Sequence, residues 1–138
     1  MNLVVDANII FSVLIKSGKT EEILFESSLN LFSPEFIFEE FNKYKKEILE
    51  KTYRSESEFE KLMLIIKKKI ATVSNEETEE YITGAEEISP DPKDVDYIAL
   101  ALKLKCGLWS QDKALSGQSR VKVYTTEELA RIFSYAKT

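Results

Sequence analysis

The chain of 138 residues contains no histidine. Histidine is the general base of Ser-His-Asp triads and Cys-His dyads, and it is a ligand in most zinc sites. Its absence also excludes histidine-based ribonuclease chemistry. Acid and metal chemistry are the catalytic classes that this composition leaves open.

Cysteine is almost as scarce, because Cys106 stands alone. A single cysteine cannot form a disulfide within the chain, which agrees with a reducing compartment, and its apolar neighbours indicate a buried thiol. No apolar run reaches the roughly 18 residues that cross a bilayer. The start, MNLVVDANII, lacks the basic segment and cleavage site of a signal peptide. We therefore expect a cytoplasmic protein without a membrane span.

Glycine and proline are few, with four and three residues. Together with 43% hydrophobic and 31% charged residues, this composition is typical of a globular protein. The length predicts one domain, residues 1–138. The net charge of -5 argues against a general affinity for nucleic acid, so local basic patches would have to provide any such affinity.

Strand-like and helix-like spacings of apolar residues alternate along the chain. The predicted strands are residues 3–5, 29–33, 71–74, 108–110 and 121–124. The predicted helices are residues 7–16, 20–28, 34–52, 55–70, 75–88 and 93–105, and a terminal helix that Thr125 or Thr126 caps.

The helix predicted over residues 34–52 has Ser33 as its cap and Pro34 in its first turn. Its apolar stripe is Ile37, Phe41, Tyr44 and Ile48. Strands separated by helices, without hairpin signals, predict a mainly parallel sheet with helices on both faces. The predicted fold class is α/β, a three-layer α/β/α domain.

Four carboxylates fall where strand-like and helix-like runs meet: Asp6, Glu40, Asp94 and Asp112. Ligands of parallel α/β sheets bind at the carboxyl ends of the strands, where Asp6 and Asp112 are expected. If the four converge, a close pair repels by about 4 kcal/mol at an effective dielectric of about 20, which a cation or protonation would relieve. The alternative for each acid alone is a helix cap or a solvated helix face.

Asp6 directly ends a strand that is predicted to be buried, where an unpaired charge is costly. Asn8 is placed to orient it. On a helical projection Glu40 flanks the apolar stripe, whereas Glu39 lies nearly opposite. The same projection puts Asp94 near the inward face of its helix and Asp96 on the far side.

Asp91 precedes a proline and is a candidate helix cap, although it would project like Asp94 if the helix began one turn earlier.

Four segments occur in a recognisable order and spacing: VVDANII, SPEFIFEEF, DPKDVDYIALAL and WSQDKAL. With them the chain resembles, over essentially its full length, the PIN domain superfamily of metal-dependent ribonucleases. The resemblance is strongest to the small prokaryotic and archaeal members that include the VapC toxins. The long region with many lysines between Glu40 and Asp94 departs from the commonest toxin pattern.

The resemblance implies that Asp6, Glu40, Asp94 and Asp112 form an acidic quartet and that hydrolysis leaves a 5′-phosphate. It also implies that Asn8 supports Asp6, that Ser110 stands where the family often has Ser or Thr, and that Asp91 is an optional extra ligand. Hard oxygen ligands without His or Cys favour Mg²⁺ or Mn²⁺. We expect Asp6 and Asp94 to be the principal metal ligands, Asp112 a ligand through water, and Glu40 a ligand or a base.

RNA is the expected partner, and a helical region supplies candidate contacts in Lys43, Lys46, Lys51 and Arg54. The alternative for most of them is a solvated face with ion pairs at i,i+4. If the chain is a toxin, an antitoxin protein or a homodimer is expected, and Phe11, Leu14 and Phe25 are candidates for such an interface. Core packing is the favoured alternative for these three. The alternative function is a catalytically inactive PIN-like module that binds RNA or protein.

Overall fold

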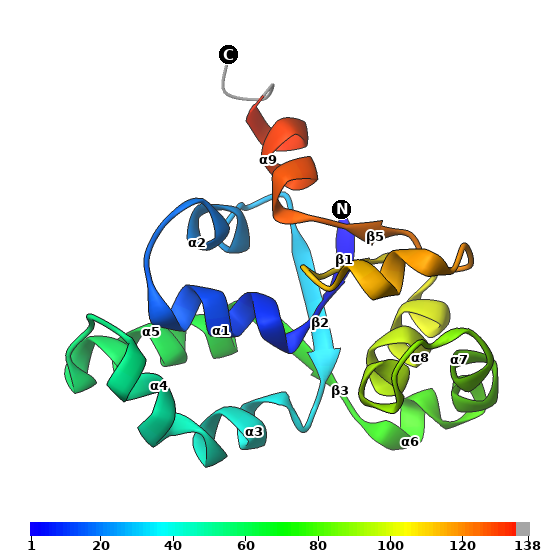
Figure 1. Cartoon of the computed structure of the whole chain (residues 1–138), viewed down its shortest axis with the longest axis horizontal. Coiled ribbons are helices and arrows are strands. Elements are labelled where there is room, and N and C mark those ends of the chain that lie inside the picture. The colour runs from blue at the N-terminus through cyan, green and yellow to red at the C-terminus, as the bar shows by residue number, and fades with distance from the viewer. Residues whose placement is uncertain (135–138) are drawn as a thin grey trace.

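The structure, a computed structural model, describes residues 1–134; residues 135–138 of the predicted domain lie outside this range. Five parallel strands form one sheet in the order β3-β2-β1-β4-β5 (Figure 1). The strands are β1 (Asn2–Val5), β2 (Asn30–Pro34), β3 (Ile70–Val73), β4 (Gly107–Trp109) and β5 (Val123–Tyr124). The predicted α/β fold with a parallel sheet is confirmed.

Helices cover the sheet in two groups. The first group is α1 (Ala7–Ile15), α2 (Lys19–Leu24), α3 (Ile37–Lys43), α4 (Lys45–Lys51) and α5 (Glu56–Lys69). The second group is α6 (Asn75–Thr78), α7 (Ile82–Ile88) and α8 (Val95–Leu104). Figure 1 shows α1, α2 and α5 on one side of the central strands and α6, α7 and α8 on the other, which is the predicted three-layer arrangement.

The core sits around β1, whose Leu3, Val4 and Val5 are fully buried. Strands that are covered on both faces have continuous apolar runs instead of alternating ones, as this segment does. Ala99 and Ala101 of α8 are also buried, and these small side chains let the helix approach the sheet closely.

The strand order reverses beside β1. The chain proceeds outward through β2 and β3, then crosses to the other side of β1 for β4 and β5. The carboxyl ends of β1 and β4 therefore lie side by side where the connections diverge. In open parallel sheets this position is the usual ligand crevice.

The prediction of one helix over residues 34–52 is wrong in two respects. Pro34 is the last residue of β2, paired with Val73, and the Ser33 hydroxyl donates to the Val5 carbonyl (3.2 Å) instead of capping a helix. The helical segment is also interrupted at Tyr44, where the backbone turns to φ -101° and ψ 11°. Because of this break Tyr44 leaves the apolar stripe and is 41% exposed, while Phe41 before it and Ile48 after it both reach the core.

The acidic helix predicted over residues 75–88 is divided into α6, the 3₁₀ turn η1 (Glu79–Tyr81) and α7. Its first half carries Glu76, Glu77, Glu79 and Glu80. Like charges three and four residues apart destabilise a continuous helix, which agrees with the interruption within this run.

The remaining boundaries are close to those predicted. Ser55 caps α5 through a reciprocal pair of bonds with Glu58. The terminal helix is α9 (Thr126–Ser134), and of the two predicted caps Thr125 accepts from the Glu128 N–H (3.1 Å). The last strand is shorter than predicted. None of the helices in residues 1–134 is long and apolar enough to cross a membrane.

Core packing accounts for the three aromatic and aliphatic residues that were candidates for an interface. Leu14 is fully buried, and Phe11 and Phe25 pack against the core. Cys106 is half-buried, and burial raises the pKa of its thiol, so it agrees with an unreactive cysteine.

Candidate active site

Asp6 stands at the end of β1, and its backbone N–H extends the sheet by donating to the Trp109 carbonyl (3.0 Å). The side chain is buried and is held by residues from both ends of the chain. The Ser110 hydroxyl donates to Asp6 Oδ2 (2.7 Å), and Asn8 Nδ2 donates to the same oxygen (3.3 Å). Asn8 also donates to Ser110 Oγ (3.3 Å), so the three side chains form a closed set. The fold thus joins positions that are 104 residues apart.

Burial raises the pKa of Asp6, with a further upward contribution from the charge of Asp112. The Ser110 hydroxyl acts in the opposite direction because it stabilises the carboxylate. Asp112 is held near this set of side chains, because its backbone N–H donates to Ser110 Oγ (3.0 Å). Its own carboxylate accepts from the Ala114 N–H (3.0 Å) at the start of the 3₁₀ turn η3 (Lys113–Gly117).

Asp94 approaches from another element, the 3₁₀ turn η2 (Pro92–Asp94) that precedes α8. It is buried, and its Oδ2 has no hydrogen-bond partner. Burial raises the pKa of Asp94 to about 6, and the charges of Asp6, Asp112 and Asp91 add to the rise. A buried carboxylate oxygen without a donor is costly, and a cation or a proton would satisfy it.

These carboxylates border one cavity of about 620 Å³ at the carboxyl ends of β1 and β4. Its lining residues are Asp6, Ala7, Asn8, Phe11, Phe36, Glu40, Tyr44, Lys93, Asp94, Asp96, Tyr97 and Asp112. All four predicted acids and Asn8 are therefore brought to one cavity, while Ser110 lies behind it and bonds to Asp6. Glu40 lines the cavity and Glu39 does not, as the helical projection predicts.

Asp91 lies outside this lining and serves as a cap, because its Oδ1 accepts from the Lys93 N–H (2.9 Å). The prediction that Asp96 points to the far side is wrong, since Asp96 also borders the cavity. The projection assumed one regular helix from Lys93. The 3₁₀ turn η2 instead shifts the angular position of Asp94 relative to α8.

Tyr97 is a cavity residue that sequence reasoning missed. Its hydroxyl is buried without a partner, and burial, followed by the charges of Asp6 and Glu40, raises the pKa of this phenol. The sequence did contain a signal for Tyr97, because a residue three positions after Asp94, about one helical turn, lies on the same face of a helix as Asp94.

No ion pair joins any of the four acids to a lysine or arginine within residues 1–134. Lys93 is the cation of the cavity lining. The same residues contain no group of three or more Asp, Glu or Cys side chains arranged to hold a metal ion. The acids thus share a cavity without forming a closed cage of ligands.

The basic residues expected to contact RNA have different surroundings. The guanidinium of Arg54 is bonded within the protein, because its Nη2 donates to the Val13 carbonyl (3.0 Å) and to Glu21 (3.2 Å). Lys51 pairs with Glu47 at 3.5 Å on the exposed face of α4. Lys43 lies over the Tyr44 ring, with its Nζ 5.6 Å from the centroid.

The model of the PIN domain family matches residues 4–133, nearly the whole chain. The chain belongs to the PIN domain family. PIN domains are generally nucleases that use divalent metals and bind nucleic acid. No curated protein matches this chain.

The residues of this PIN domain fit a hard divalent cation. Asp94 Oδ2 is buried without a hydrogen-bond partner, and burial, followed by the charges of neighbouring acids, raises the pKa values of Asp6 and Asp94. Both observations indicate carboxylates that a cation would stabilise. Mg²⁺ is usually held by one or two carboxylates and several waters instead of a complete protein cage. A set of separated carboxylates around a solvent-accessible cavity is compatible with that mode of binding.

Proposed function

We propose that this PIN domain, residues 1–138, is a Mg²⁺- or Mn²⁺-dependent endoribonuclease. The observation that supports this most is the convergence of Asp6, Glu40, Asp94 and Asp112 on one cavity without any ion pair among the described residues. A protein gains no stability from gathering acids in this way. Such an arrangement is expected where a cation has to be bound for catalysis.

Asp6 and Asp94 are the proposed principal ligands, with Asp112 acting through water. When bound, the ion would activate a water molecule and offset the charge that develops on the attacked phosphate. Ser110 and Asn8 hold Asp6 in a fixed orientation, because both donate to its Oδ2. Glu40 also lines the cavity and is proposed as a ligand or as the base that accepts a proton from the attacking water.

RNA binding requires cations around this negative cavity. Lys93 is proposed to contact the phosphate nearest to the scissile bond, since it lines the cavity. A separate recess of about 230 Å³ shares Phe11 and Tyr44 with the lining of the cavity, and Lys51 lines it. We propose that Lys51, with Lys43 and Lys46 on the same segment, contacts the RNA backbone. Arg54 is left out because its guanidinium bonds within the protein.

We also propose that the protein acts as a toxin, and this more specific proposal rests on the sequence resemblance to VapC toxins. We expect expression of the chain to arrest bacterial growth and Asp94→Asn to abolish the arrest. An antitoxin segment would then occlude the acidic cavity.

Cleavage of a mixed RNA pool with Mn²⁺ tests the nuclease proposal. The wild-type protein is expected to cleave, and Asp6→Asn and Asp94→Asn are expected to lose at least about a hundredfold in rate, because each removes a metal ligand. Glu40→Gln and Glu39→Gln form a matched pair, since they remove equal charge from neighbouring positions of α3 and only Glu40 lines the cavity. Equal rates for wild type, Asp6→Asn and Asp94→Asn would refute the nuclease proposal and favour the inactive binding module.

A further inference from the structure

The outer edge of the sheet at β3 carries backbone groups without a partner strand. β3 pairs with β2 on one side, and no strand within residues 1–134 pairs with it on the other. The Glu35 N–H donates to the Val73 carbonyl, so the backbone of Val73 faces β2. Because successive residues of a strand face opposite sides, the N–H and carbonyl of Thr72 point to the outer edge. Ala71 and Thr72 are both exposed, so this edge is open to a further strand.

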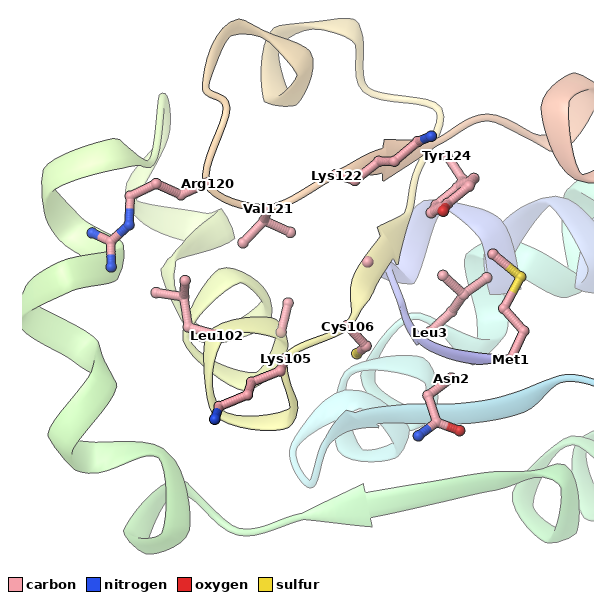
Figure 2. Close-up of a pocket in the computed structure, with 12 residues that line it drawn as sticks. Met1, Asn2, Leu3, Leu102, Lys105, Cys106, Arg120, Val121, Lys122 and Tyr124 are labelled. Carbon is pink, nitrogen blue, oxygen red and sulfur yellow. The ribbon is translucent and has the colours of Figure 1, made fainter.

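Figure 2 shows this edge together with a cavity of about 850 Å³ at the starts of β1 and β4. The charged ends of Lys105, Arg120 and Lys122 point away from one another around the cavity, so they do not form one binding site. β3, drawn in green, runs beside β2, and its outer side faces the open lower margin of the view. The open edge of β3 is therefore the more informative surface.

The helix that leads into this edge exposes large apolar side chains. Leu64 is 60% exposed and Ile65 is 52% exposed on α5. Lys68 follows them at the spacing of one helical turn, so the three side chains are neighbours on the surface of the helix. Adjacent exposed aliphatic side chains beside an open strand edge indicate a surface that another protein chain covers.

The charges at the two ends of β3 are opposite in sign. Lys67 and Lys68 precede the strand, Glu76 and Glu77 follow it, and all four are exposed. The salt bridges of the described residues involve none of them. When two identical strands pair antiparallel, the start of each lies beside the end of the other. The basic end of one copy then meets the acidic end of the other at both places, so the edge is complementary in charge to a second copy of itself.

We propose that two copies of this chain form a homodimer in which their β3 strands pair antiparallel about a twofold axis at Thr72. The Ile70 N–H donates to the Ile66 carbonyl within the protein and is not free to pair with a second strand. Both backbone groups of Thr72 are free, so the two Thr72 residues exchange a pair of hydrogen bonds. In this register Lys68 lies four residues before the axis, near Glu76 of the second copy, which lies four residues after it.

The same axis brings the two α5 helices together. An axis perpendicular to the sheet keeps both helices on one face of the continuous sheet, so Leu64 and Ile65 of each copy pack against α5 of the other. This contact removes their apolar surface from water. The acidic cavity borders β1 and β4, which are separated from β3 by β2, so the dimer leaves the cavity open. The proposal does not depend on the nuclease function.

Sedimentation equilibrium of the full chain in EDTA tests the proposal. The wild type is expected to dimerise with a Kd below about 100 µM, as for a small interface. Lys68→Glu and Glu76→Lys are each expected to weaken dimerisation at least about tenfold, because each places like charges together at both ends of the paired strands. An equal mixture of these two variants is expected to dimerise again, since each copy then meets charges opposite to its own. The double variant is expected to dimerise like the wild type for the same reason.

Lys105→Glu is the matched control, because it makes the same charge change at the C-terminal end of α8, on the β4 side of the sheet, and should leave the Kd unchanged. All three substituted side chains are exposed, so the variants should fold, which circular dichroism checks. A wild type that stays monomeric at about 1 mM, ten times the expected limit, would overturn the proposal and leave this edge to a different protein. Equal dimerisation of the wild type and both single variants, or a mixture of the two that stays monomeric, would also overturn it. RNA cleavage enters none of these measurements, so their outcome is separate from that of the nuclease proposal.

Discussion

Asp94→Asn is expected to stabilise the folded protein while it abolishes cleavage. Asp94 is 9% exposed, and burial beside other acids raises its pKa from 3.8 to about 6. That difference corresponds to about 3 kcal/mol of unfavourable free energy when the carboxylate is charged in the folded state. Because the side chain borders a solvent-accessible cavity that screens it, we expect about half of this value to be recovered in Asp94→Asn.

The stabilisation should depend on pH in a defined direction. A carboxylate with a raised pKa keeps its proton in the folded state while the unfolded chain releases it, so stability falls as pH rises from about 4 to 6. The advantage of Asp94→Asn should therefore be full above pH 7 and absent below pH 4. Thermal unfolding at pH 7.5 in EDTA should show a Tm about 3–6 °C above that of the wild type.

The exposed Glu39→Gln serves as a control, since it removes a charge away from the cavity and should change the Tm by less than about 2 °C. Mn²⁺ at ten times its Kd should stabilise the wild-type protein by about 1.4 kcal/mol and so raise its Tm. The rise in Tm should be smaller for Asp94→Asn, because this variant lacks one of the proposed ligands. Two results would refute the conclusion that Asp94 carries a destabilising charge in the folded protein. One is an Asp94→Asn protein that is no more stable than wild type at pH 7.5. The other is an Asp94→Asn protein whose gain in stability is as large at pH 4 as at pH 7.5.

Three further changes test other parts of the structure. Ser110→Ala removes the shortest hydrogen bond to Asp6, so it should lower Mn²⁺-dependent cleavage about 10–100-fold and cost about 1–3 kcal/mol of stability, as cleavage and unfolding assays run in parallel should show. Thr126→Val leaves the buried Trp109 Nε1–H without its acceptor (3.1 Å) and should cost about 1–3 kcal/mol in urea unfolding. Gly107→Ala places a Cβ 2.7 Å from the Tyr124 ring and should cost about 1–3 kcal/mol, and an unchanged urea midpoint would contradict this packing.

The parallel α/β architecture and the convergence of the four acids on one cavity could be predicted, because they follow from local patterns and one general rule. Short apolar runs that end at Asp6 and shortly before Asp112 mark strand ends, and in a parallel sheet the carboxyl ends meet at one edge. The choice of Glu40 over Glu39 as the acid that faces the cavity followed from helical periodicity alone, since α3 is regular around that position.

The errors arose where tertiary packing overrode local propensity. Pro34 is a good first residue of a helix, yet its backbone completes the pairing of β2 with Val73. Tyr44 fits an apolar stripe, but a straight helix would not direct both α3 and α4 into the core. Asp96 was misplaced because a 3₁₀ turn before α8 changes the angle per residue, and no single residue signals such a turn.

The bond between Ser110 and Asp6 has a consequence for how the protein is made. Translation produces Asp6 104 residues before Ser110. A nascent chain that has not yet reached Ser110 and Asp112 therefore lacks the hydrogen bond that orients Asp6 and one of the four acids of the cavity. If this domain cleaves RNA, a nascent chain cannot cleave its own messenger before those residues have been made.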